Sequence, residues 1–322
     1  MAQPSSIGSI EPAYDAHNRR VRGFYDSVVI SPDQVESVVG QSRRLADQTG
    51  ATRISLRFVV NTPWPVAMYE SGDERGLWLP SPDGLRLAGN ETASIPLSGR
   101  RERVVYFGEN DPTRIEPEAV RQKETGMVLE SIRTARERNP FSKAHANGYS
   151  VDVERGVTRD PDVRRLFDLY SSVYRDYVFP LTEENVAALV QNPNSITAFV
   201  RGARDDIAAA AVAEVLEMYI DGEILRICEI SDEATHPGYR GNGLNQACVQ
   251  SLVDELMRGR DEISLVYAED RATSRGVNQQ SANLGWVFAG RLNKAGRINA
   301  DRNIEIDGPY EDLNVWYYPL QK

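Results

Sequence analysis

The stretch EISDEATHPGYRGNGLNQACVQSLVDEL, residues 229–256, places a strand-like run directly before a helix-like run. Pro237 ends the strand, because proline has no N–H to donate to a sheet. Gly241 and Gly243 give the turn backbone conformations that other residues avoid. Apolar residues at helical spacing then begin at Leu244. The chain must therefore contain a strand that turns tightly into a helix, which points to an architecture in which helices pack on a sheet.

The second half of the sequence predicts an ordered series of strands and helices. Apolar residues alternate in the strand-like runs and recur at helical spacing in the others. The predicted strands cover residues 149–154, 196–201, 207–219, 223–235, 263–268, 286–292 and 313–319, and the predicted helices cover 161–177, 182–190, 243–258 and 274–284. Asp221-Gly222, between two of these strands, is typical of a hairpin turn. The order is β-α-α-β-β-β-α-β-α-β-β, and the three consecutive strands predict a mixed sheet.

The first half of the sequence predicts a smaller mixed α/β unit. The predicted strands are 21–30, 53–60 and 103–107, the predicted helices are 32–48 and 116–138, and residues 61–98 predict turns and short strands. The segment NPFSKAHANG, residues 139–148, has the composition of a linker. We therefore expect an α/β protein of the α+β mixed-sheet kind, with an N-terminal domain at 1–145 and a C-terminal domain at 146–322.

Composition argues against several classes of function. The 322 residues carry a net charge of −10, which disfavours nucleic acid and anionic membranes as partners. The two cysteines lack a CxxC spacing and the three histidines are far apart, so we expect neither a disulfide framework nor a bound metal. The N-terminus has no signal-peptide pattern, and the most apolar run, residues 207–216, is too short to cross a bilayer. We therefore expect a cytoplasmic protein.

The loop that follows residue 236 has the chemistry of a phosphate-binding site. Its glycines let a ligand approach the backbone, and the next helix offers free N–H groups and the positive end of its dipole. Arg240 adds a fixed positive charge. The loop lacks the Lys and Ser/Thr of a P-loop and the third glycine of a dinucleotide fingerprint. It predicts a phosphate cradle of another kind, with a purely structural turn as the alternative.

The loop and the C-terminal segments carry a resemblance to a known family. The R-x-x-G-x pattern of residues 240–244, after a strand, and the order of elements from residue 149 resemble the GCN5-related N-acetyltransferase (GNAT) superfamily. The segments EISDEATHPGYRGNGL, SRGVNQQSANLGWVFAGRLNKAGRI and EDLNVWYYPL are similar to β-lysine N-acetyltransferases, which acetylate the side-chain amine of a diamino acid. Asn245 departs from the family pattern, which has Gly or Ala there. The N-terminal domain can be interpreted as a degenerate second copy of the same fold.

The resemblance implies acetyl-CoA as the cosubstrate. Backbone N–H groups of the loop would hold its pyrophosphate, and one N–H near residues 234–236 would polarise the thioester carbonyl. Asn278 matches an asparagine that contacts the pantetheine or sulfur region in the family, and a helix N-cap is its alternative interpretation. The residues implied in cofactor binding are Ala234, Thr235, His236, Arg240, Gly241, Asn242, Gly243, Leu244 and Asn278.

Acetyl transfer to an amine requires a base for the ammonium proton and a donor for the leaving thiolate. The candidate bases are Glu229, then Asp232, then Glu233, and each of them could instead be a solvated or ion-paired acid. In the family, the thiolate is often protonated by a tyrosine four residues before the glycine of a Leu-Gly-Phe/Tyr turn. Ser281 occupies that position here. A water molecule, Tyr239 or Tyr267 are the alternative donors.

Three functions are compatible with these observations. The first is an N-acetyltransferase that uses acetyl-CoA and a small-molecule amine, such as an amino acid or a diamino acid of the lysine or β-lysine type. The second is a non-catalytic acyl-CoA-binding regulatory module, because the usual tyrosine is replaced. The third is a transferase that acts on a protein or peptidyl substrate docked by the N-terminal half. The sequence leaves open whether the chain forms a homodimer.

Overall fold

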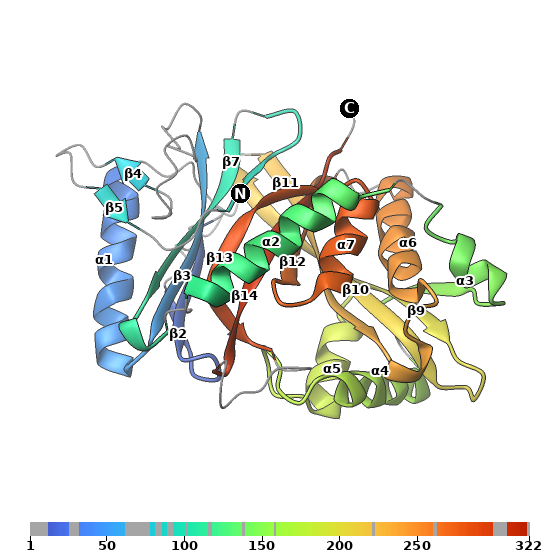
Figure 1. Ribbon diagram of the computed structural model, residues 1–322. Coiled ribbons are helices and arrows are strands. Elements are labelled where there is room, and N and C mark those ends of the chain that lie inside the picture. The colour runs from blue at the N-terminus through green and yellow to red at the C-terminus, as the bar shows by residue number, and fades with distance from the viewer. Residues whose placement is uncertain are drawn as a thin grey trace, which may run out of the picture.

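The computed structural model describes residues 12–25, 32–61, 78–80, 86–88, 93–100, 102–114, 118–136, 139–157, 159–220, 223–259, 263–298 and 308–320. These residues form two main sheets that lie side by side, with helices against their faces (Figure 1). A small hairpin of β4 (Trp78–Pro80) and β5 (Arg86–Ala88) is separate from both sheets. Within this described part of the chain, no helix combines the length and apolar character needed to cross a bilayer.

The second half of the chain forms a seven-stranded mixed sheet in the order β13-β14-β12-β11-β10-β9-β8. The strands are β8 (Val151–Arg155), β9 (Ser195–Arg201), β10 (Ile207–Ile220), β11 (Glu223–Thr235), β12 (Ile263–Arg271), β13 (Val287–Arg297) and β14 (Tyr310–Tyr318). Among the pairs in this sheet, β11 and β12 run parallel and the others are antiparallel. A parallel pair requires a crossover connection, which the helix after the glycine loop provides.

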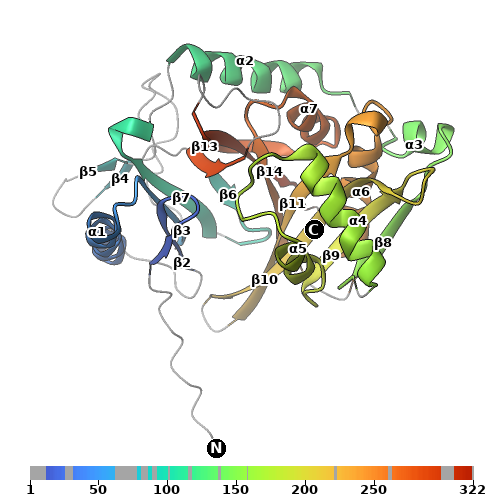
Figure 2. The same cartoon turned by 90° about the horizontal axis from the view of Figure 1, so that it is seen from below.

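Two helices lie on each face of this sheet. Side chains of a strand alternate between the faces, and here both faces carry apolar side chains that a helix can cover. The helices α4 (Asp160–Val173) and α5 (Glu183–Val190) cover one face, and α6 (Leu244–Arg258) and α7 (Arg275–Asn283) cover the other (Figures 1 and 2). Leu166 packs with the alternate strand residues Phe199 and Val212. Leu252 packs with their neighbours Ala198 and Ala211 on the opposite face.

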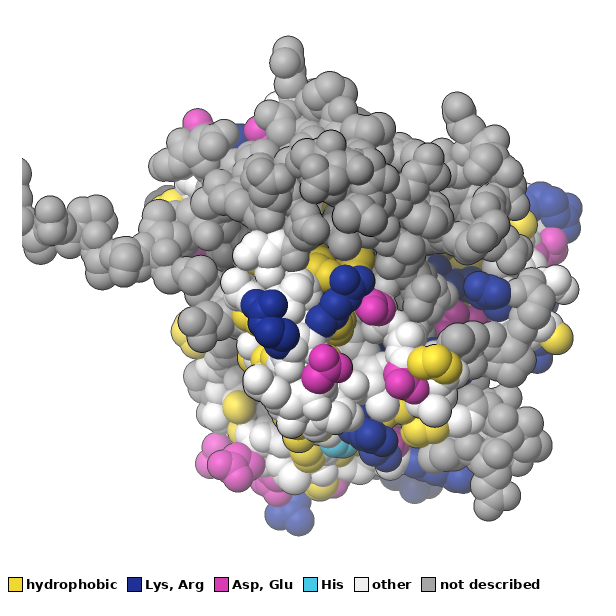
Figure 3. All heavy atoms as spheres, turned by 90° about the vertical axis from the view of Figure 1, so that its left-hand side faces the viewer, with side chains coloured by type: hydrophobic (Ala, Val, Ile, Leu, Met, Phe, Trp, Pro, Cys, Tyr) yellow, Lys and Arg dark blue, Asp and Glu magenta, His cyan; other side chains and the backbone are white. Residues whose placement is uncertain are grey.

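The first half of the chain forms a five-stranded sheet in the order β1-β2-β3-β7-β6. The strands are β1 (Ala13–Asp15), β2 (Arg20–Tyr25), β3 (Arg53–Asn61), β6 (Ser94–Pro96) and β7 (Glu102–Asn110). The helix α1 (Pro32–Thr49) covers one face, where Val39 packs with Leu56 and Phe107. The outer surface around α1 carries charged side chains of both signs with apolar ones among them (Figure 3).

Two helices connect the sheets. The helix α2 (Glu118–Thr134) packs on α7 and lies over β13, as both ribbon views show (Figures 1 and 2). The short helix α3 (Ser142–Ala146) occupies the stretch whose composition is typical of a linker, and it packs on α6. A single-turn 3-10 helix (Pro112–Arg114) follows β7, and another (Pro237–Tyr239) lies in the glycine loop.

The predicted order of elements in the second half is confirmed, and so is the mixed α/β unit before it. The predicted strand 21–30 is described only as far as Tyr25, and residues 26–30 lie outside the described part of the chain. The predicted hairpin turn at residues 221–222 lies outside it as well. So do most of residues 61–98, apart from β4, β5 and β6.

The two sheets are joined where β13 leaves its regular pairing with β14. The register of that pair shifts between Leu292 and Gly296, and Lys294 there has a φ of 50°. The carbonyl groups of residues 293, 294 and 295 are instead bound from the N-terminal unit. Arg53 Nη1 donates to Asn293 O at 2.5 Å, Arg114 Nε donates to Lys294 O at 3.0 Å, and Arg20 Nη1 donates to Ala295 O at 2.9 Å.

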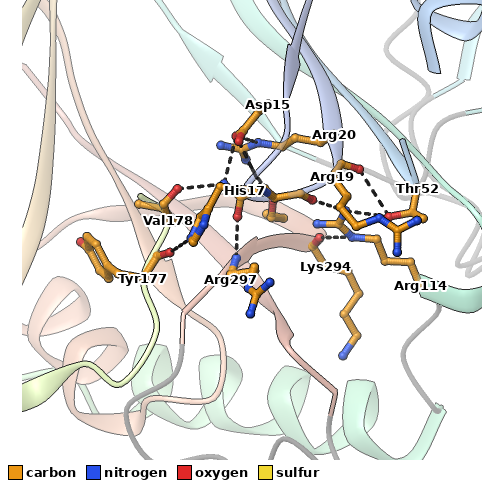
Figure 4. A network of polar contacts seen from close by, with 12 residues as sticks. Asp15, His17, Arg19, Arg20, Thr52, Arg114, Tyr177, Val178, Lys294 and Arg297 are labelled. Carbon is orange, nitrogen blue, oxygen red and sulfur yellow. Dashed lines mark hydrogen bonds and ion pairs between the residues drawn. The ribbon is translucent and has the colours of Figure 1, made fainter. Parts of the chain in front are cut away.

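The turn between β1 and β2 extends this junction to the segment after α4. His17 Nε2 lies 2.6 Å from Tyr177 O, and Asn18 Nδ2 donates to Val178 O at 2.8 Å (Figure 4). Asn18 Oδ1 accepts from the backbone N–H of Arg297 at 2.8 Å. An apolar core also continues from one unit to the other, since Val59 and Ile95 belong to the same buried cluster as Tyr170 and Leu292. The N-terminal unit is therefore packed firmly on the C-terminal sheet.

Arg114 gives a measure of what this junction contributes to stability. Its side chain is 3% exposed, donates to Lys294 O and to Asn18 O, and lies 3.5 Å from the ring centroid of Tyr310. Arg114→Met would leave two buried carbonyl groups without these donors. We expect the free energy of unfolding to fall by about 2–4 kcal/mol, measured by urea denaturation.

Arg43→Met is the matched control for this experiment. Arg43 also makes an ion pair, at 2.8 Å from Glu109, but its side chain is 47% exposed. An exposed pair contributes roughly 0–1 kcal/mol, so this variant should remain close to the wild type. Equal effects of the two substitutions would show that Arg114 does not support the junction.

Candidate functional site

The site forms where the two parallel strands at the centre of the large sheet separate. Their pairing runs from Arg226 with Ile263 to Ile230 with Ala268, although β11 continues to Thr235 and β12 to Arg271. Beyond this point β11 remains paired with β10, and β12 remains paired with β14. The edges that face each other therefore carry backbone groups free of this ladder, and a cavity opens between them.

A bulge in β11 lies at the point of separation. Ala210 pairs with Ala234 and Val212 pairs with Ser231, so two residues of β11 oppose one residue of β10. Asp232, within the bulge, has a φ of 51°, which is uncommon for a residue other than glycine. Strained backbone of this kind is found often at functional sites. The bulge turns the Asp232 side chain into a buried position, 7% exposed.

The first cavity has a volume of about 770 Å³ and lies between the separated strands and the N-terminus of α6. Gly243, with a φ of 73°, precedes α6, and no side chain caps the helix. The first N–H groups of a helix have no partner within it, so those of residues 243–246 are available to a ligand. Gly243, Leu244, Asn245 and Gln246 all line the cavity. This end of the cavity can therefore bind an anion.

Two cationic side chains line the same end of the cavity. Arg240 comes from the glycine loop, and Lys143 comes from α3. Lys143 lies directly over the loop, because a Cβ atom added to Gly243 would be 3.3 Å from Lys143 Cβ. Asn147 of the same segment donates to Asn242 Oδ1 at 3.0 Å. At this end of the cavity, Lys143 of α3 therefore lies over the glycine loop, in addition to the N–H groups at the start of α6.

A second cavity, of about 830 Å³, lies between the C-terminal sheet and the N-terminal sheet. Its N-terminal wall includes Arg20, Arg22, Ser55 and Arg57 of β2 and β3. Five residues line both cavities, which therefore adjoin. The shared residues are Tyr177, Ser231, Asp232, Glu269 and Ile298.

A carboxyl cluster lies where the cavities meet. Tyr177 donates its hydroxyl hydrogen to Asp232 Oδ1 at 2.7 Å. Ser231 Oγ lies 2.8 Å from Asp232 Oδ2 and 3.2 Å from Glu214 Oε1. One hydroxyl hydrogen cannot serve both carboxylates, so the pair of bonds favours a proton on one of them. Burial raises the pKa of Asp232, and burial, followed by the charges of Asp232 and Glu229, raises the pKa of Glu214 to about 7.

Two further acids with raised pKa values line the first cavity at this point. Glu233 Oε2 accepts from Asn245 Nδ2 at 2.5 Å and from Gln280 Nε2 at 2.8 Å, and burial raises its pKa to about 7. Asn245 departs from the family pattern, and here its side chain holds a carboxylate. Burial and the charge of Glu229 likewise raise the pKa of Glu269 to about 7. These groups can exchange protons near neutral pH.

Glu229, ranked first among the predicted bases, lies away from the first cavity. It lines the second cavity, where Tyr267 donates to its Oε2 at 2.6 Å and Arg57 Nη1 lies 3.6 Å away. Arg57 also donates to the hydroxyl of Tyr267. Glu229 is therefore engaged in an ion pair, whereas Asp232 lines both cavities.

The structure brings together most, but not all, of the residues predicted for cofactor binding. Thr235, Arg240, Gly241, Gly243 and Leu244 line the first cavity with Asp232. Ala234, His236 and Asn242 belong to the same strand and loop but do not line it. Their backbones continue the bulge and the turn, so they shape the site without facing it.

Asn278 and Ser281 are both buried structural residues of α7. Asn278 is 0% exposed, donates to the carbonyls of Arg271 and Ser274, and accepts from Asn314 and Trp316. Its amide therefore has no capacity left for a ligand. It is neither a helix N-cap, because the N-cap of α7 is Ser274, nor part of the cavity lining.

Ser281 is 4% exposed and donates to Asp270 Oδ2 at 2.6 Å, and it lines neither cavity. Tyr239 is bound to Asp206, and Tyr267 is bound to Glu229, so neither hydroxyl faces the junction. Tyr177 is the described tyrosine that lines both cavities. The prediction did not include Tyr177, Glu269, Lys143 or Arg57. The carboxylate Glu269 could have been inferred, since the end of β12 lies beside the end of β11.

Comparisons with known proteins agree with the resemblance inferred from the sequence. No family model matches the chain. The chain is 30% identical over 155 residues to the N-acetyltransferase YodP of Bacillus subtilis, and 25% identical over 162 residues to the β-lysine N(6)-acetyltransferase of Methanococcus maripaludis. These matches cover 48% and 50% of this chain, and 50% and 53% of the relatives. The chain thus spans about half the length of the curated relatives it matches.

Solved structures of acetyltransferases are similar over part of the chain. Arabidopsis thaliana NAA60 in complex with a bisubstrate analogue has a TM-score of 0.43 and 13% identity, over 53% of this chain and 100% of that chain. The ribosomal-protein-S18-alanine N-acetyltransferase of Escherichia coli has a TM-score of 0.38 and 17% identity, over 54% and 96%. The relatives that match by sequence confirm the resemblance to N-acetyltransferases, including those of the β-lysine type.

The carboxyl cluster predicts a pH-dependent stability that Glu214→Gln should reveal. A carboxyl whose pKa is raised on folding stabilises the protein fully below its unfolded value of about 4.5, and that stability is lost as the pH rises through about 7. The glutamine of the variant cannot ionise, so no charged carboxylate is buried at this position as the pH rises. We expect its free energy of unfolding, relative to the wild type, to increase between pH 5 and pH 8 in urea denaturation.

Glu217→Gln serves as the control on the same strand. Glu217 is exposed and pairs with Arg226 at 3.2 Å, so it lies outside the buried cluster. Its difference from the wild type should stay nearly constant from pH 5 to pH 8. A Glu214→Gln curve parallel to that of the wild type would contradict the raised pKa.

Proposed function

We propose that the protein is an N-acetyltransferase that uses acetyl-CoA and acts on a small-molecule amine. One observation carries the proposal: the first cavity is lined at one end by an anion-binding helix N-terminus and, where it adjoins the second cavity, by a buried carboxyl cluster. The similarity to N-acetyltransferases over half of the chain supports the same reaction. The activity requires these two sites in this order, since the acetyl donor and the amine must meet between them.

The first cavity fits the donor. Its pyrophosphate would bind the N–H groups of residues 243–246, with Arg240 and Lys143 as counter-charges. The arm that carries the thioester is a chain of amides, and the unpaired edges of β11 and β12 can hydrogen-bond to it as to an added strand. When bound, the donor supplies an activated acetyl group next to the Asp232 bulge.

Asp232 is the best placed base for the acceptor. It lines both cavities, and its raised pKa suits it to take a proton from an ammonium group entering from the second cavity. The neutral amine then attacks the acetyl carbonyl carbon, the bond from that carbon to sulfur breaks, and the nitrogen of the new amide loses its second proton to water. The bulge leaves backbone groups of β11 outside the ladder, and one N–H of these can stabilise the carbonyl oxygen as negative charge develops.

Tyr177 supplies the proton for the leaving thiolate in this scheme. Tyr177 lines both cavities, and its hydroxyl is bonded to Asp232. As Tyr177 gives its hydrogen to the sulfur, Asp232 returns the proton that it took from the amine to the tyrosine oxygen. The two groups thus exchange one proton each and end in their initial states. This role replaces the one that the sequence assigned to Ser281.

The acceptor in this proposal is small. The second cavity is bounded by both units of the chain and has a volume within the range of small-molecule sites. An open groove would favour a protein or peptidyl substrate instead. The acids at the junction, with pKa values raised toward neutrality, also favour a catalytic role over a regulatory module that only binds acyl-CoA.

Asp232→Asn tests the catalytic assignment. The variant keeps the shape of the side chain and can still bond Tyr177, but it cannot accept a proton. We expect kcat for CoA release, measured with a thiol reagent across a panel of primary amines, to fall by about 10²–10⁴-fold, while the Kd for acetyl-CoA is little changed.

Asp168→Asn, on the exposed side of α4, is the control and should retain the activity. Glu229→Gln should lower kcat less than Asp232→Asn, because Glu229 lines only the acceptor cavity. Absence of CoA release with every small amine would contradict the proposed function. Full activity in Asp232→Asn would reject this residue as the base.

Gly243→Val tests the cofactor cradle. A side chain at this position would be strained at a φ of 73° and would meet Lys143 and the ligand surface. We expect the Kd for acetyl-CoA, measured by calorimetry, to rise at least tenfold. Gly50→Val, at a φ of 66° with open space around it, carries the same backbone strain far from the site. The cradle assignment would be wrong if both variants bound acetyl-CoA equally well.

A further inference from the structure

One face of the N-terminal sheet is rich in arginines and faces the second cavity. Parallel pairing sets Arg20 opposite Arg53, and Arg22 opposite Ser55, so these side chains share a face with Arg57. The other face of the same strands packs under α1 with Val21, Ile54 and Leu56. Alternation thus gives each strand one apolar side and one cationic side.

Most arginines on this face already have partners. Arg20 pairs with Asp15 at 2.9 Å and donates to Ala295 O. Arg53 donates to Asn110 Oδ1 and to Asn293 O. Arg57 lies 3.6 Å from Glu229 and donates to Tyr267. These three guanidinium groups hold the two units together or neutralise the cavity wall.

Arg22 differs from its neighbours. It lines the second cavity and is exposed, and among the residues that the structure describes no carboxylate is paired with it. A guanidinium group is always charged and presents a planar pair of donors that matches a carboxylate. Arg22 therefore offers the cavity a cationic group that no carboxylate of the described residues neutralises.

The opposite wall of the cavity has the opposite chemistry. Glu214, Asp232 and Glu269 come from the C-terminal sheet, and Asp232 and Glu269 also line the first cavity. An amine would be drawn to this wall. The cavity thus has a cation on the N-terminal unit and a carboxyl cluster on the C-terminal unit, and a ligand with complementary ends would satisfy both.

We propose that Arg22 determines acceptor specificity by binding a carboxylate on the amine substrate. The acceptor is then an amino acid that places its reactive amine at Asp232 while its carboxylate bonds to Arg22. This inference rests on the proposed acetyl transfer for the reaction, but the binding of a carboxylate by Arg22 can be measured without turnover. Arg22 does not touch the reacting atoms, so it acts on recognition of the acceptor and leaves the chemical step to the carboxyl cluster.

Matched acceptors provide the test. Ornithine and lysine are compared with ornithinamide and lysinamide, which keep the amines and lack the carboxylate charge. For the wild-type chain we expect kcat/KM to favour at least one carboxylate over its amide by about ten- to a hundredfold, as a charged hydrogen bond contributes. In Arg22→Gln this preference should fall to within about threefold, mainly through KM, and Arg22→Lys should keep part of it.

Arg164→Gln is the matched control, because Arg164 is an exposed arginine on α4 that lines neither cavity. This variant should keep the full preference. Calorimetric titration of the same four amines into wild type and Arg22→Gln, each with CoA present, measures the preference independently of turnover.

The outcomes separate the two proposals. Tighter binding of a carboxylate, lost in Arg22→Gln but without turnover of any amine, would support Arg22 and overturn the acetyl-transfer proposal. Turnover without a preference, or with a preference that survives in Arg22→Gln, would overturn the role of Arg22 alone. If none of the four amines binds or reacts, both proposals fail for this class of acceptor.

Discussion

The separation of β11 from β12 is the feature on which the rest of the site depends. Up to Ile230 and Ala268 the two strands form an ordinary parallel ladder, and beyond these residues each strand is held only by its other neighbour. The gap opens the first cavity, and both the bulge at Asp232 and the loop before α6 contribute to its lining. A sheet paired along its full length would have none of these.

The N-terminal unit completes what the separated strands begin. It closes the second cavity with β2 and β3, and it is held there by arginines that bind three successive carbonyls of β13. Those carbonyls are available because Lys294 and its neighbours leave the ladder with β14. Irregularities in two strands of one sheet therefore serve two purposes: the bulge in β11 shapes the first cavity, and the irregular part of β13 holds the N-terminal wall of the second.

Sequence reasoning predicted the fold of the second half well, because its signals are local. Alternation, helical spacing and the glycine loop each depend on residues that are neighbours in the chain. It also named Thr235, Arg240 and Gly243 together with Asp232, and these residues line one cavity. It overestimated Ser281 and Asn278, since their family positions are filled here by residues whose hydrogen bonds are used within the core. It missed Tyr177 and Arg57, because their roles arise only when distant segments meet.

The strand β3 shows most clearly what the sequence pattern of a strand leaves undetermined. Its apolar residues Ile54, Leu56 and Phe58 correctly identified the strand, but their alternation does not say what the residues between them face. In the structure that side is the inner wall of a cavity. A charged face of a strand cannot be assigned to solvent or to a site until the sheet opposite it is known.

The division of the cavity between two stretches of chain has an evolutionary consequence. The strands and the loop that would hold the donor lie after residue 230, whereas the wall that would select the acceptor is built largely from β2 and β3. Substitutions on that wall can alter which molecule is accepted without disturbing the part of the site that would hold the donor. A lineage built on this plan could therefore acquire new acceptors through changes in its first sixty residues, while the rest of the chain stayed under constant selection.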